Sequence, residues 1–380
     1  MYSLGDYGSM IADPVRIGPY LQAIEAAVRP GSVVLDLGCG PALFSLVACR
    51  AGARRVYAVD LEEIVHFGRH FAAANHFTDR IDFLRGDSRQ IQLPERADVI
   101  VSDLRGALPF YGPSLLVLED ARRRHLAPGG TMIPEKDTLF AAIVESGEFY
   151  RKITSPWCSP IRELDLSVAL PYRLNEVHLF EVTREQLLAE PQAWWVIDYG
   201  GAHSTRASGT VRFQSARSAT AHGIAIWFDT QLYGTIGFSS GPGTAKTVYG
   251  QTLLPFPQPI PMSTGQEVQV ELHADLIGSD YVWRWETRTV EKETGVLHHF
   301  RQSTLQGAQF SPHWLRRHAR DFVPVLSTEG EAERWLLQAM DGNTALEKIA
   351  KDAAARFSNV FCDEEDAFRR ASALAERFSH

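Results

Sequence analysis

A short apolar run that leads through an acidic residue into a tight turn of small residues constrains the fold of this chain most. The run is Val33–Leu37, which contains Asp36, and Gly38-Cys39-Gly40-Pro41-Ala42 follow directly. Glycine permits positive φ angles and lets the backbone approach a ligand, and the first turn of a helix offers unpaired N–H groups. The pattern predicts a strand, a turn and a helix that together bind a nucleotide-like cofactor.

The spacing of these small residues separates two classes of cofactor. A dinucleotide-binding turn places a third glycine at its sixth position, where this chain has Leu43. The spacing D-x-G-x-G, formed by Asp36, Gly38 and Gly40, is instead typical of S-adenosylmethionine methyltransferases. The next predicted strand ends at Asp60, whose carboxylate can accept hydrogen bonds from two ribose hydroxyls. We predict an S-adenosylmethionine site; a plain strand-turn-helix with two solvated acids is the alternative.

Strands and helices alternate from Gly31 to about residue 134. The predicted strands are Val33–Leu37, Val56–Val59, Ile81–Leu84 and Val99–Ser102, and the predicted helices are Leu43–Ala51, Ile64–Asn75 and Pro113–His125. This α/β order favours a parallel sheet with helices on both faces. Pro128-Gly129-Gly130 then predicts a sharp turn.

Beyond Pro134 the pattern changes to strands without long helices. Apolar and polar side chains alternate in Val268–His273 and in Tyr281–Glu286. A period of two with many aromatic residues predicts a mostly antiparallel sheet or barrel. The stretches Ser239–Thr244 and Pro255–Pro261 are rich in Pro and Gly and are predicted to be loops.

From Asp321 onward the chain is predicted to form a small helical module. A capping box of Thr328 and Glu331 precedes one amphipathic helix, and a second box of Thr344 and Glu347 precedes another. A third helix is predicted to begin at Asp363.

Composition limits the classes of ligand and partner. The 38 Lys and Arg against 46 Asp and Glu leave a net charge of −8, which excludes a general basic field for nucleic acid or an anionic membrane. The four cysteines form no C-x-x-C pair, and no apolar run is long enough to span a bilayer, so we expect a cytoplasmic protein. His66 and His70 lie one helical turn apart but have no third ligand nearby, so we predict no metal site.

The segment before the first strand makes the cofactor assignment more specific. Met10-Ile11-Ala12-Asp13-Pro14-Val15-Arg16 resembles the M-x-x-D-x-x-R segment of protein arginine methyltransferases. By this resemblance, Arg16 meets the carboxylate of the methionine moiety through a bidentate pairing that lysine cannot reproduce. The alternative is an exposed arginine at the start of a helix.

The resemblance extends from Tyr2 to about Glu286. It includes the Gly129-Gly130 turn, the Ile133-Pro134 junction, and Gly223–Asp229 followed by Thr247–Gln251. It implies an N-terminal helical segment in residues 1–30, a seven-stranded Rossmann-like class I domain in 31–134 and a β-barrel substrate domain in 135–310, followed by the helical module in 321–380. The family's dimerisation arm would fall in Ser167–Phe180, a much shorter segment here, which leaves the family's homodimer open.

The turn and the resemblance together predict two sets of site residues. The cofactor set is Tyr7, Met10, Arg16, Asp36, Gly38, Gly40, Asp60, Leu61, Asp87, Ser88 and Asp103. The catalytic set is Asp103, Arg105 and Tyr249. The acid that the family places at the adenine amino group aligns with Arg89 in this chain. We therefore expect the neighbouring Asp87 or Ser88 to meet the adenine instead.

The chain departs from the family in the loop that holds the acceptor side chain. The family has two glutamates that bind a guanidinium there, whereas this chain has Asp103 at the first position and Gly112 at the second. The family's Thr-His-Trp loop reads Thr247-Val248-Tyr249. A guanidinium, with a pKa above ~12, needs closely placed carboxylates to orient it. One shorter carboxylate favours a less demanding acceptor than arginine.

A neutral imidazole is such an acceptor. Its unperturbed pKa of ~6.5 makes it a nucleophile at neutral pH, and one carboxylate can hold its other N–H. We predict Asp103 in that role, with Arg105 paired to Asp103 or to an acidic group of the substrate. A strand-end cap is the alternative for Asp103, and core packing is the alternative for Tyr249.

The turn Asp341-Gly342-Asn343-Thr344, between two predicted helices, resembles the small winged-helix domain of pyrroloquinoline-quinone biosynthesis and related peptide-tailoring enzymes. Such domains bind the leader of a ribosomally made precursor, often by adding its strand to a sheet edge. Eight acids against six bases from Asp341 to His380 argue against the alternative of a DNA-binding helix-turn-helix. A structural helical cap is the other alternative.

We therefore predict an S-adenosylmethionine-dependent methyltransferase that modifies a side chain, with histidine favoured, of a peptide or protein such as a ribosomal peptide natural-product precursor. Arginine N-methylation with a rebuilt clamp is the alternative within the enzymes. A non-catalytic scaffold that binds the cofactor and a peptide is the alternative from another class.

Overall fold

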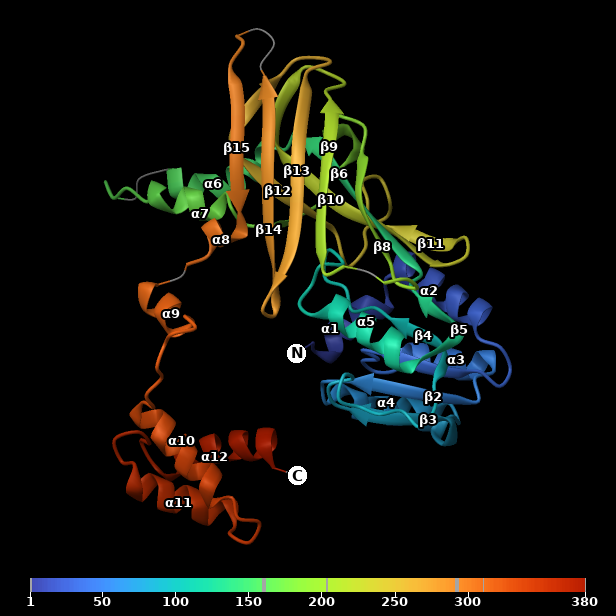
Figure 1. The fold of residues 1–380 in the computed structure, drawn as a ribbon, viewed down its shortest axis with the longest axis vertical. Coiled ribbons are helices and arrows are strands. Elements are labelled where there is room, and N and C mark those ends of the chain that lie inside the picture. Colours follow the sequence, from blue (N-terminus) through green and yellow to red (C-terminus); the bar gives the residue numbers. More distant parts are fainter. Residues whose placement is uncertain (1, 159–161, 203, 291–293, 310, 380) are drawn as a thin grey trace. The chain divides into compact units, whose positions relative to one another are not determined.

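The computed structural model describes residues 2–158, 162–202, 204–290, 294–309 and 311–379. The chain folds into two compact units, which are Met1–Ala308 and Gln309–His380 (Figure 1). Among the residues described, the larger unit contains one parallel and two antiparallel sheets, and the smaller unit contains helices. Within these ranges, no helix is long and apolar enough to cross a membrane.

The parallel sheet has the strand order β3-β2-β1-β4-β5. Its strands are β1 (Val33–Leu37), β2 (Arg55–Asp60), β3 (Ile81–Arg85), β4 (Ala97–Ser102) and β5 (Leu126–Ile133). The sheet of the described residues therefore has five strands instead of the seven predicted, because the chain leaves it after β5 and enters the antiparallel region.

Helices cover both faces of this sheet. On one face lie α2 (Pro14–Ala27), α3 (Leu43–Ala51) and α4 (Ile64–Ala74), and on the other lies α5 (Ser114–His125). A short 3₁₀ helix, η1 (Thr78–Arg80), leads into β3. All five residues of β1 are buried, as expected for a central parallel strand between two helical layers. The α/β order predicted from the sequence is confirmed.

The predicted turn at residues 128–130 is instead an irregularity inside β5. Ala97 of β4 pairs with Leu126 and Val99 pairs with Thr131, so several residues of β5 lie opposite a single residue of β4. Gly129 adopts a positive φ of 77° within this bulge. A bulge uses the same small, flexible residues as a turn, which is why the sequence signal was ambiguous.

Two antiparallel sheets follow and share one apolar core in a barrel-like arrangement. The six-stranded sheet has the order β7-β12-β10-β6-β8, with β11 paired to β10, and the four-stranded sheet has the order β15-β14-β13-β9. The strands of the first are β6 (Lys136–Val144), β7 (His178–Phe180), β8 (Gln192–Asp198), β10 (Ala219–Tyr233), β11 (Ile236–Ser239) and β12 (Gln251–Met262). Those of the second are β9 (Arg206–Gln214), β13 (Glu267–Ile277), β14 (Asp280–Val290) and β15 (Leu297–Ser303). The predicted antiparallel β domain is confirmed.

The predicted loop at Pro255–Pro261 is wrong, because these residues lie within β12. Gly223 pairs with Pro255 and Ala221 pairs with Ile260, so the segment bulges away from β10. A proline lacks a backbone donor and is tolerated in a strand at such a bulge.

A helical insertion separates β6 from β7. It contains α6 (Gly147–Cys158), the 3₁₀ helix η2 (Ser167–Ala169) and α7 (Leu170–Arg173), and it projects from the side of the barrel (Figure 1). The resemblance predicts a shortened arm in Ser167–Phe180 only. The insertion is longer than that, because it begins at Gly147 and includes α6, whose Tyr150 and Ile153 are buried. The 3₁₀ helix η3 (Arg184–Gln186) and α8 (Thr304–Gly307) complete the larger unit.

The smaller unit packs three helices around an apolar core. These are α10 (Thr328–Ala339), α11 (Leu346–Arg356) and α12 (Glu364–Phe378), and α9 (Pro312–Arg317) precedes them in the chain. Ser327 caps α10 instead of Thr328, and α11 begins without a side-chain cap. The third helix was predicted to begin at Asp363, and Asp363 is the residue that caps α12. The helical module is confirmed, but residues 311–379 contain no strand that would form the predicted wing.

Candidate active site

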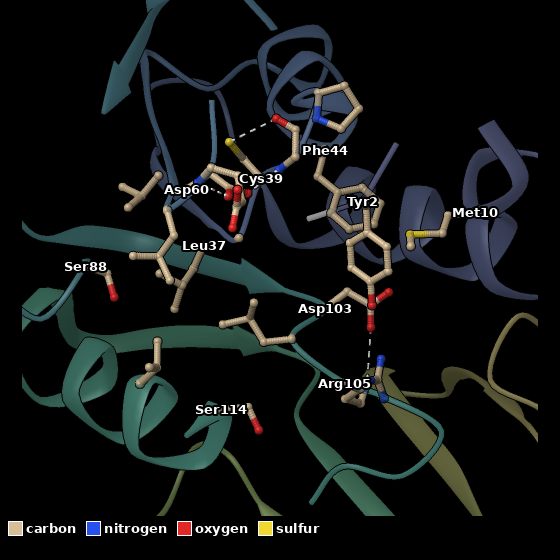
Figure 2. A pocket seen from close by; sticks show the side chains of 18 of the residues that line it. Tyr2, Met10, Leu37, Cys39, Phe44, Asp60, Ser88, Asp103, Arg105 and Ser114 are labelled. Atoms are coloured by element: carbon tan, nitrogen blue, oxygen red, sulfur yellow. Dashed lines mark hydrogen bonds and ion pairs between the residues drawn. The ribbon is translucent and has the colours of Figure 1, made fainter. Parts of the chain in front are cut away.

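A cavity of about 450 Å³ lies where β1, β2 and β4 end, next to α1 (Leu4–Ile11) (Figure 2). Most residues of the predicted sets line it: Tyr7, Met10, Arg16, Gly38, Gly40, Asp60, Leu61, Asp87, Ser88, Asp103 and Arg105. Asp36 and Tyr249 do not line it. Ligands of parallel α/β folds bind at this carboxyl edge of the sheet.

The turn after β1 has the backbone that the two glycines permit. Gly38 and Gly40 adopt φ angles of 72° and 51°, and Ala42, the residue before α3, is also left-handed with φ 68°. A Cβ atom on Gly38 would lie 2.5 Å from Leu104, and one on Gly40 would lie 2.6 Å from the ring of Tyr7. Both glycines are therefore required by conformation and by close packing of neighbouring side chains.

Asp60 holds this turn in place. One carboxylate oxygen accepts a hydrogen bond from the Gly40 N–H (2.8 Å), and the other accepts one from the Glu62 N–H (2.9 Å). The free lone pairs of both oxygens remain available to a ligand in the cavity. The carboxylate of Glu62 also lines the cavity and has no hydrogen bond or ion pair to any described residue. Glu62 is not among the predicted site residues, although it lies two residues after the strand-end acid Asp60.

Asp36 has a structural position behind the turn. It is buried, and one of its oxygens accepts hydrogen bonds from the backbone N–H (2.9 Å) and the hydroxyl (2.6 Å) of Ser45 in α3. Its other oxygen has no partner among the described residues. Burial raises the pKa of Asp36 to about 7, although the bonds from Ser45 act in the opposite direction. Asp36 thus ties β1 to α3 and does not reach the cavity.

Of the two residues predicted to meet the adenine, Asp87 and Ser88, only Ser88 has a side chain that is free of partners among the described residues. The carboxylate of Asp87 is held by the Arg89 guanidinium at 2.6 to 3.1 Å, and this bond lowers the pKa of Asp87. Ser88 lines the cavity, and its side chain is labelled in Figure 2. Because Asp87 is engaged, Ser88 is the better placed of the two predicted adenine partners.

Asp13 and Arg16 connect the N-terminal segment to the other parts of the site. Asp13 caps α2 through the N–H groups of Val15 and Arg16, and its second oxygen accepts a bond from the Val248 N–H (2.8 Å). Arg16 donates from Nη1 to the Met10 carbonyl, while Nη2 has no hydrogen-bond partner among the described residues. Arg16 therefore retains a free donor at the cavity. The bond from Asp13 to the barrel was not predicted.

Asp103 lies at the centre of a buried hydrogen-bond network. Arg16 donates from Nε to one of its oxygens at 2.5 Å, and Arg105 donates from Nε to the other at 3.1 Å. The Tyr249 hydroxyl contacts both oxygens at 2.6 and 2.7 Å and accepts a bond from Arg16. Tyr249 is a buried positioning residue beside the cavity. The structure thus brings together all three predicted catalytic residues.

Arg105 is a buried cation surrounded by acceptors and aromatic rings. Its side chain is 2% exposed, and Nη1 donates to both oxygens of the fully buried Asp137 at 2.9 and 3.2 Å. Thr230 and Tyr20 accept its other bonds. The guanidinium carbon lies 5.1 to 5.8 Å from four ring centres, those of Phe228, Tyr249, Tyr20 and Phe238.

This network sets the charge of the acceptor end. Burial alone would raise the pKa of Asp103, but the charges of Arg16 and Arg105 and the bond from Tyr249 outweigh burial and lower it. Asp103 is therefore ionised at neutral pH. Two arginines and the two carboxylates of Asp103 and Asp137 leave the network without net charge.

Gly112 occupies the second clamp position without a side chain. Its φ is 47°, and a Cβ atom there would lie 3.8 Å from the Ser279 carbonyl, an ordinary contact. A glutamate at this position would meet backbone strain and no severe clash. Within the described residues, no three His, Cys, Asp or Glu side chains are placed to hold a metal ion.

Family comparisons match the two halves of the larger unit separately. Residues 20–133 match the ribosomal protein L11 methyltransferase (PrmA) family, and residues 135–279 match the arginine methyltransferase oligomerization subdomain. The chain is a protein arginine methyltransferase-like class I methyltransferase. Residues 20–133 therefore correspond to a methyltransferase family, and residues 135–279, which include the helical insertion and most strands of the barrel, correspond to the oligomerization subdomain of arginine methyltransferases.

Similar proteins agree with this identification. The chain is 26% identical over 306 residues to the probable protein arginine N-methyltransferase 6.1 of Oryza sativa subsp. japonica, covering 70% of this chain and 77% of that protein. It is 27% identical over 285 residues to protein arginine N-methyltransferase 1 of Schizosaccharomyces pombe, covering 70% and 80%.

Two solved structures share the fold of the methyltransferase-like unit. The Trypanosoma brucei protein arginine methyltransferase 1 enzyme–prozyme heterotetrameric complex with AdoHcy has a TM-score of 0.74 at 21% identity, covering 79% of this chain and 98% of that chain. Protein arginine methyltransferase 10 of Arabidopsis thaliana has a TM-score of 0.70 at 20% identity, covering 79% and 97%.

Proposed function

We propose that this enzyme transfers a methyl group from S-adenosylmethionine to a nitrogen of a polypeptide side chain. One observation carries this proposal: a single cavity joins the Gly38–Gly40 turn and Asp60 to the ionised Asp103. The first group of residues suits a nucleoside with a charged amino acid end, and Asp103 suits the N–H of an acceptor.

The residues present fit the cofactor in four places. The free Nη2 donor of Arg16 would bind its carboxylate, Asp60 would accept bonds from its ribose, and Ser88 would meet its adenine. The backbone at Gly38, which lines the cavity with a positive φ, would lie against it. When bound, the cofactor would supply a methyl group on a positively charged sulfur, which leaves as a neutral thioether when the acceptor nitrogen forms the new N–C bond and releases a proton.

The chain's own contribution is to position the acceptor. Displacement needs the nitrogen about 3–3.5 Å from the methyl carbon and in line with the bond that breaks. Asp103 can accept a hydrogen bond from another N–H of the acceptor and so fix its orientation. Hydrogen bonds from Tyr249 and Arg16 hold the Asp103 carboxylate in position.

Arginine is the acceptor that the comparisons support, because the relatives are named arginine N-methyltransferases. The clamp for a guanidinium is then rebuilt from Asp103 and aromatic faces. Tyr2 and Tyr111 line the cavity and are 51% and 58% exposed, and the phenol of Tyr2 extends towards Asp103 (Figure 2). A cation over such rings gains about 0.5–2 kcal/mol.

Histidine is the second candidate acceptor, and the charge of the network favours it. Arg16 and Arg105 already compensate Asp103, so the pocket offers little net negative charge to a guanidinium. A neutral imidazole needs only one acceptor for its other N–H, and Asp103 provides one.

Labelled S-adenosylmethionine and matched peptides that differ only in a central Arg, His, Lys or Ala test both candidates. We expect transfer to the Arg peptide, and transfer to His alone would replace the first candidate by the second. Asp103→Asn should lower turnover at least about tenfold, because the acceptor side chain loses one charge-assisted hydrogen bond. Adenosylhomocysteine affinity should stay within about threefold. If none of these peptides is methylated, the non-catalytic scaffold is the hypothesis that is retained.

The helical module suits a role in substrate capture. Residues 309–380 form a compact unit of their own with a separate core, which is the arrangement of a tethered binding module that raises local substrate concentration. Deletion of residues 309–380 should raise KM for a full-length precursor and leave kcat for a saturating short peptide unchanged. Equal KM before and after deletion would assign the module a structural role.

Self-association is the role proposed for the helical insertion between β6 and β7. It lies within the segment that matches the arginine methyltransferase oligomerization subdomain. Leu164, Val168 and Tyr172 expose apolar side chains in it. Sedimentation should show a dimer for the native chain and a monomer for Val168→Glu, and an unchanged dimer would remove this role.

A further inference from the structure

A second cavity of about 390 Å³ lies between the acceptor loop and the barrel. Five parts of the chain line it: the loop Ala107–Tyr111, the segment 175–177 after α7, Thr252 of β12, the first residues of β14, and α8 with Ala308. Its volume is that of a pocket for a small ligand or a large side chain. Neither the cofactor nor the acceptor residues described above account for it.

Tyr111 connects this cavity to the cofactor cavity, because it lines both. Its ring packs over Gly106, where an added Cβ atom would lie 2.8 Å from the ring. The loop that presents Asp103 to the first cavity therefore presents Leu108 and Phe110 to the second. A polypeptide whose acceptor side chain reached Asp103 by way of Tyr111 would therefore meet the second cavity.

The walls of the second cavity are aromatic and preorganised. Phe110 lies 5.1 Å from Tyr281 and 5.6 Å from Trp283, measured between ring centres, and all three side chains are buried. Rings at these distances adopt tilted or edge-to-face arrangements, which a further aromatic ring can extend.

The polar groups of the cavity are already used within the protein. Asn175 binds the Ser303 N–H and the Pro171 carbonyl, and Glu176 is paired with Arg173. The hydroxyls of Thr252 and Thr304 are bonded to the backbone of Ile226 and Trp283, and Asp280 accepts a bond from the Tyr281 N–H. These bonds leave few groups to bind a charged ligand.

The hydroxyl of Tyr281 is different. The Tyr281 side chain is 7% exposed and lines the cavity, yet its hydroxyl has no hydrogen-bond partner among the described residues. A buried hydroxyl without a partner is unfavourable, and a ligand with one polar atom at its end would satisfy it only if the cavity wall shifts to expose this hydroxyl.

We propose that this cavity is a specificity subsite that binds an aromatic side chain close to the acceptor in the substrate polypeptide. The inference rests on the proposed function, since it assumes that a polypeptide is the substrate. Burial of such a side chain should favour an aromatic-flanked peptide over its alanine counterpart by about tenfold in kcat/KM.

Val177→Phe tests the subsite by filling it, and Leu179→Phe is the matched control. Val177 is half-buried in the cavity wall, whereas Leu179 is 69% exposed and lines neither cavity. With peptides that carry Trp, Tyr or Ala at each flanking position, the native chain and Leu179→Phe should prefer an aromatic residue about tenfold. Val177→Phe should reduce that preference to less than twofold and leave the alanine peptide unchanged.

Three results would overturn the subsite: no aromatic preference in the native chain, a preference that survives Val177→Phe, or a change of oligomeric state as the only effect of this substitution. Ala308→Phe, which fills the cavity from α8, replaces Val177→Phe if that variant does not fold. Peptide binding to the adenosylhomocysteine-loaded chain, measured by fluorescence anisotropy, reads the subsite independently of turnover. A preference in binding without any methyl transfer would reject the proposed function and retain the subsite.

Discussion

The two ends of the cofactor cavity are built on different principles. At the cofactor end, two glycines with positive φ and a strand-end carboxylate shape a backbone surface with free polar groups. At the acceptor end, Asp103 is surrounded by donors from Arg16, Arg105 and Tyr249, and the clamp position Gly112 has no side chain. The cofactor end can therefore be recognised from local spacing in the sequence, whereas the acceptor end depends on a buried charge balance between residues that are distant in the sequence.

Replacement of Arg105 should give the largest effect, because it breaks that balance. Arg105→Met leaves Asp103 and the fully buried Asp137 without their shared cation, and we expect a loss of about 3–5 kcal/mol in the free energy of unfolding. Urea denaturation measures this loss.

Arg122→Met is the control for Arg105→Met, because Arg122 pairs with Glu119 on the outside of α5 and should cost less than about 1 kcal/mol. Combining Arg105→Met with Asp137→Asn should recover part of the stability. A loss in Arg105→Met no larger than that of the control would contradict the charge balance.

Gly40→Val should abolish the cofactor end while the fold survives. The added Cβ meets the Tyr7 ring at 2.6 Å and forces a branched residue into a φ of 51°. We expect adenosylhomocysteine affinity to fall at least about 100-fold, which is about 2.7 kcal/mol.

Gly18→Ala is the matched glycine control for Gly40→Val, because no atom lies within 4 Å of its added Cβ in α2. Its cofactor affinity should equal that of the native chain. Titration calorimetry of both variants measures the contrast, and native-like affinity in Gly40→Val would show that the turn does not contact the ligand.

Asp36→Asn should have the smallest effect on cofactor affinity, and it separates structure from binding at the cofactor end. The folded-state pKa of Asp36, about 7, lies above its ordinary value of about 3.9, so the protonated form stabilises the fold. This contribution is complete below pH 4 and is lost as the pH rises towards 7, by about 1.4 kcal/mol per unit.

Asparagine in place of Asp36 should flatten the fall in the free energy of unfolding between pH 5 and 7, measured by urea titration at each pH. Adenosylhomocysteine affinity should stay within about threefold, because Asp36 contacts Ser45 and not the cavity. An affinity loss above tenfold with an unchanged pH slope would place Asp36 at the cofactor.

The cofactor end and the parallel sheet followed from the sequence because their signals are local. The run Val33–Leu37 matches β1 from its first residue to its last, and the residues of the glycine turn and Asp60 line the cavity as predicted. Asp36 was placed at the cavity because its spacing is right; only the fold shows that its side chain turns towards Ser45.

The acceptor end was less accessible to sequence analysis because its partners are far apart in the chain. Arg105 was predicted to pair with Asp103 or with substrate, and the structure adds Asp137, Thr230 and Tyr20 from three other elements. No spacing rule joins residues from a loop, two strands and a helix. The proline run in β12 was misread for a related reason, since a bulge within a strand depends on its pairing partner.

Titration calorimetry of the native chain with adenosylhomocysteine at two temperatures tests the central claim most directly. We predict one binding site per chain and a heat that becomes more negative as the temperature rises, because apolar surface is buried. A folded sample that gives no binding heat at either temperature would contradict the assignment of this cavity to the methyl donor.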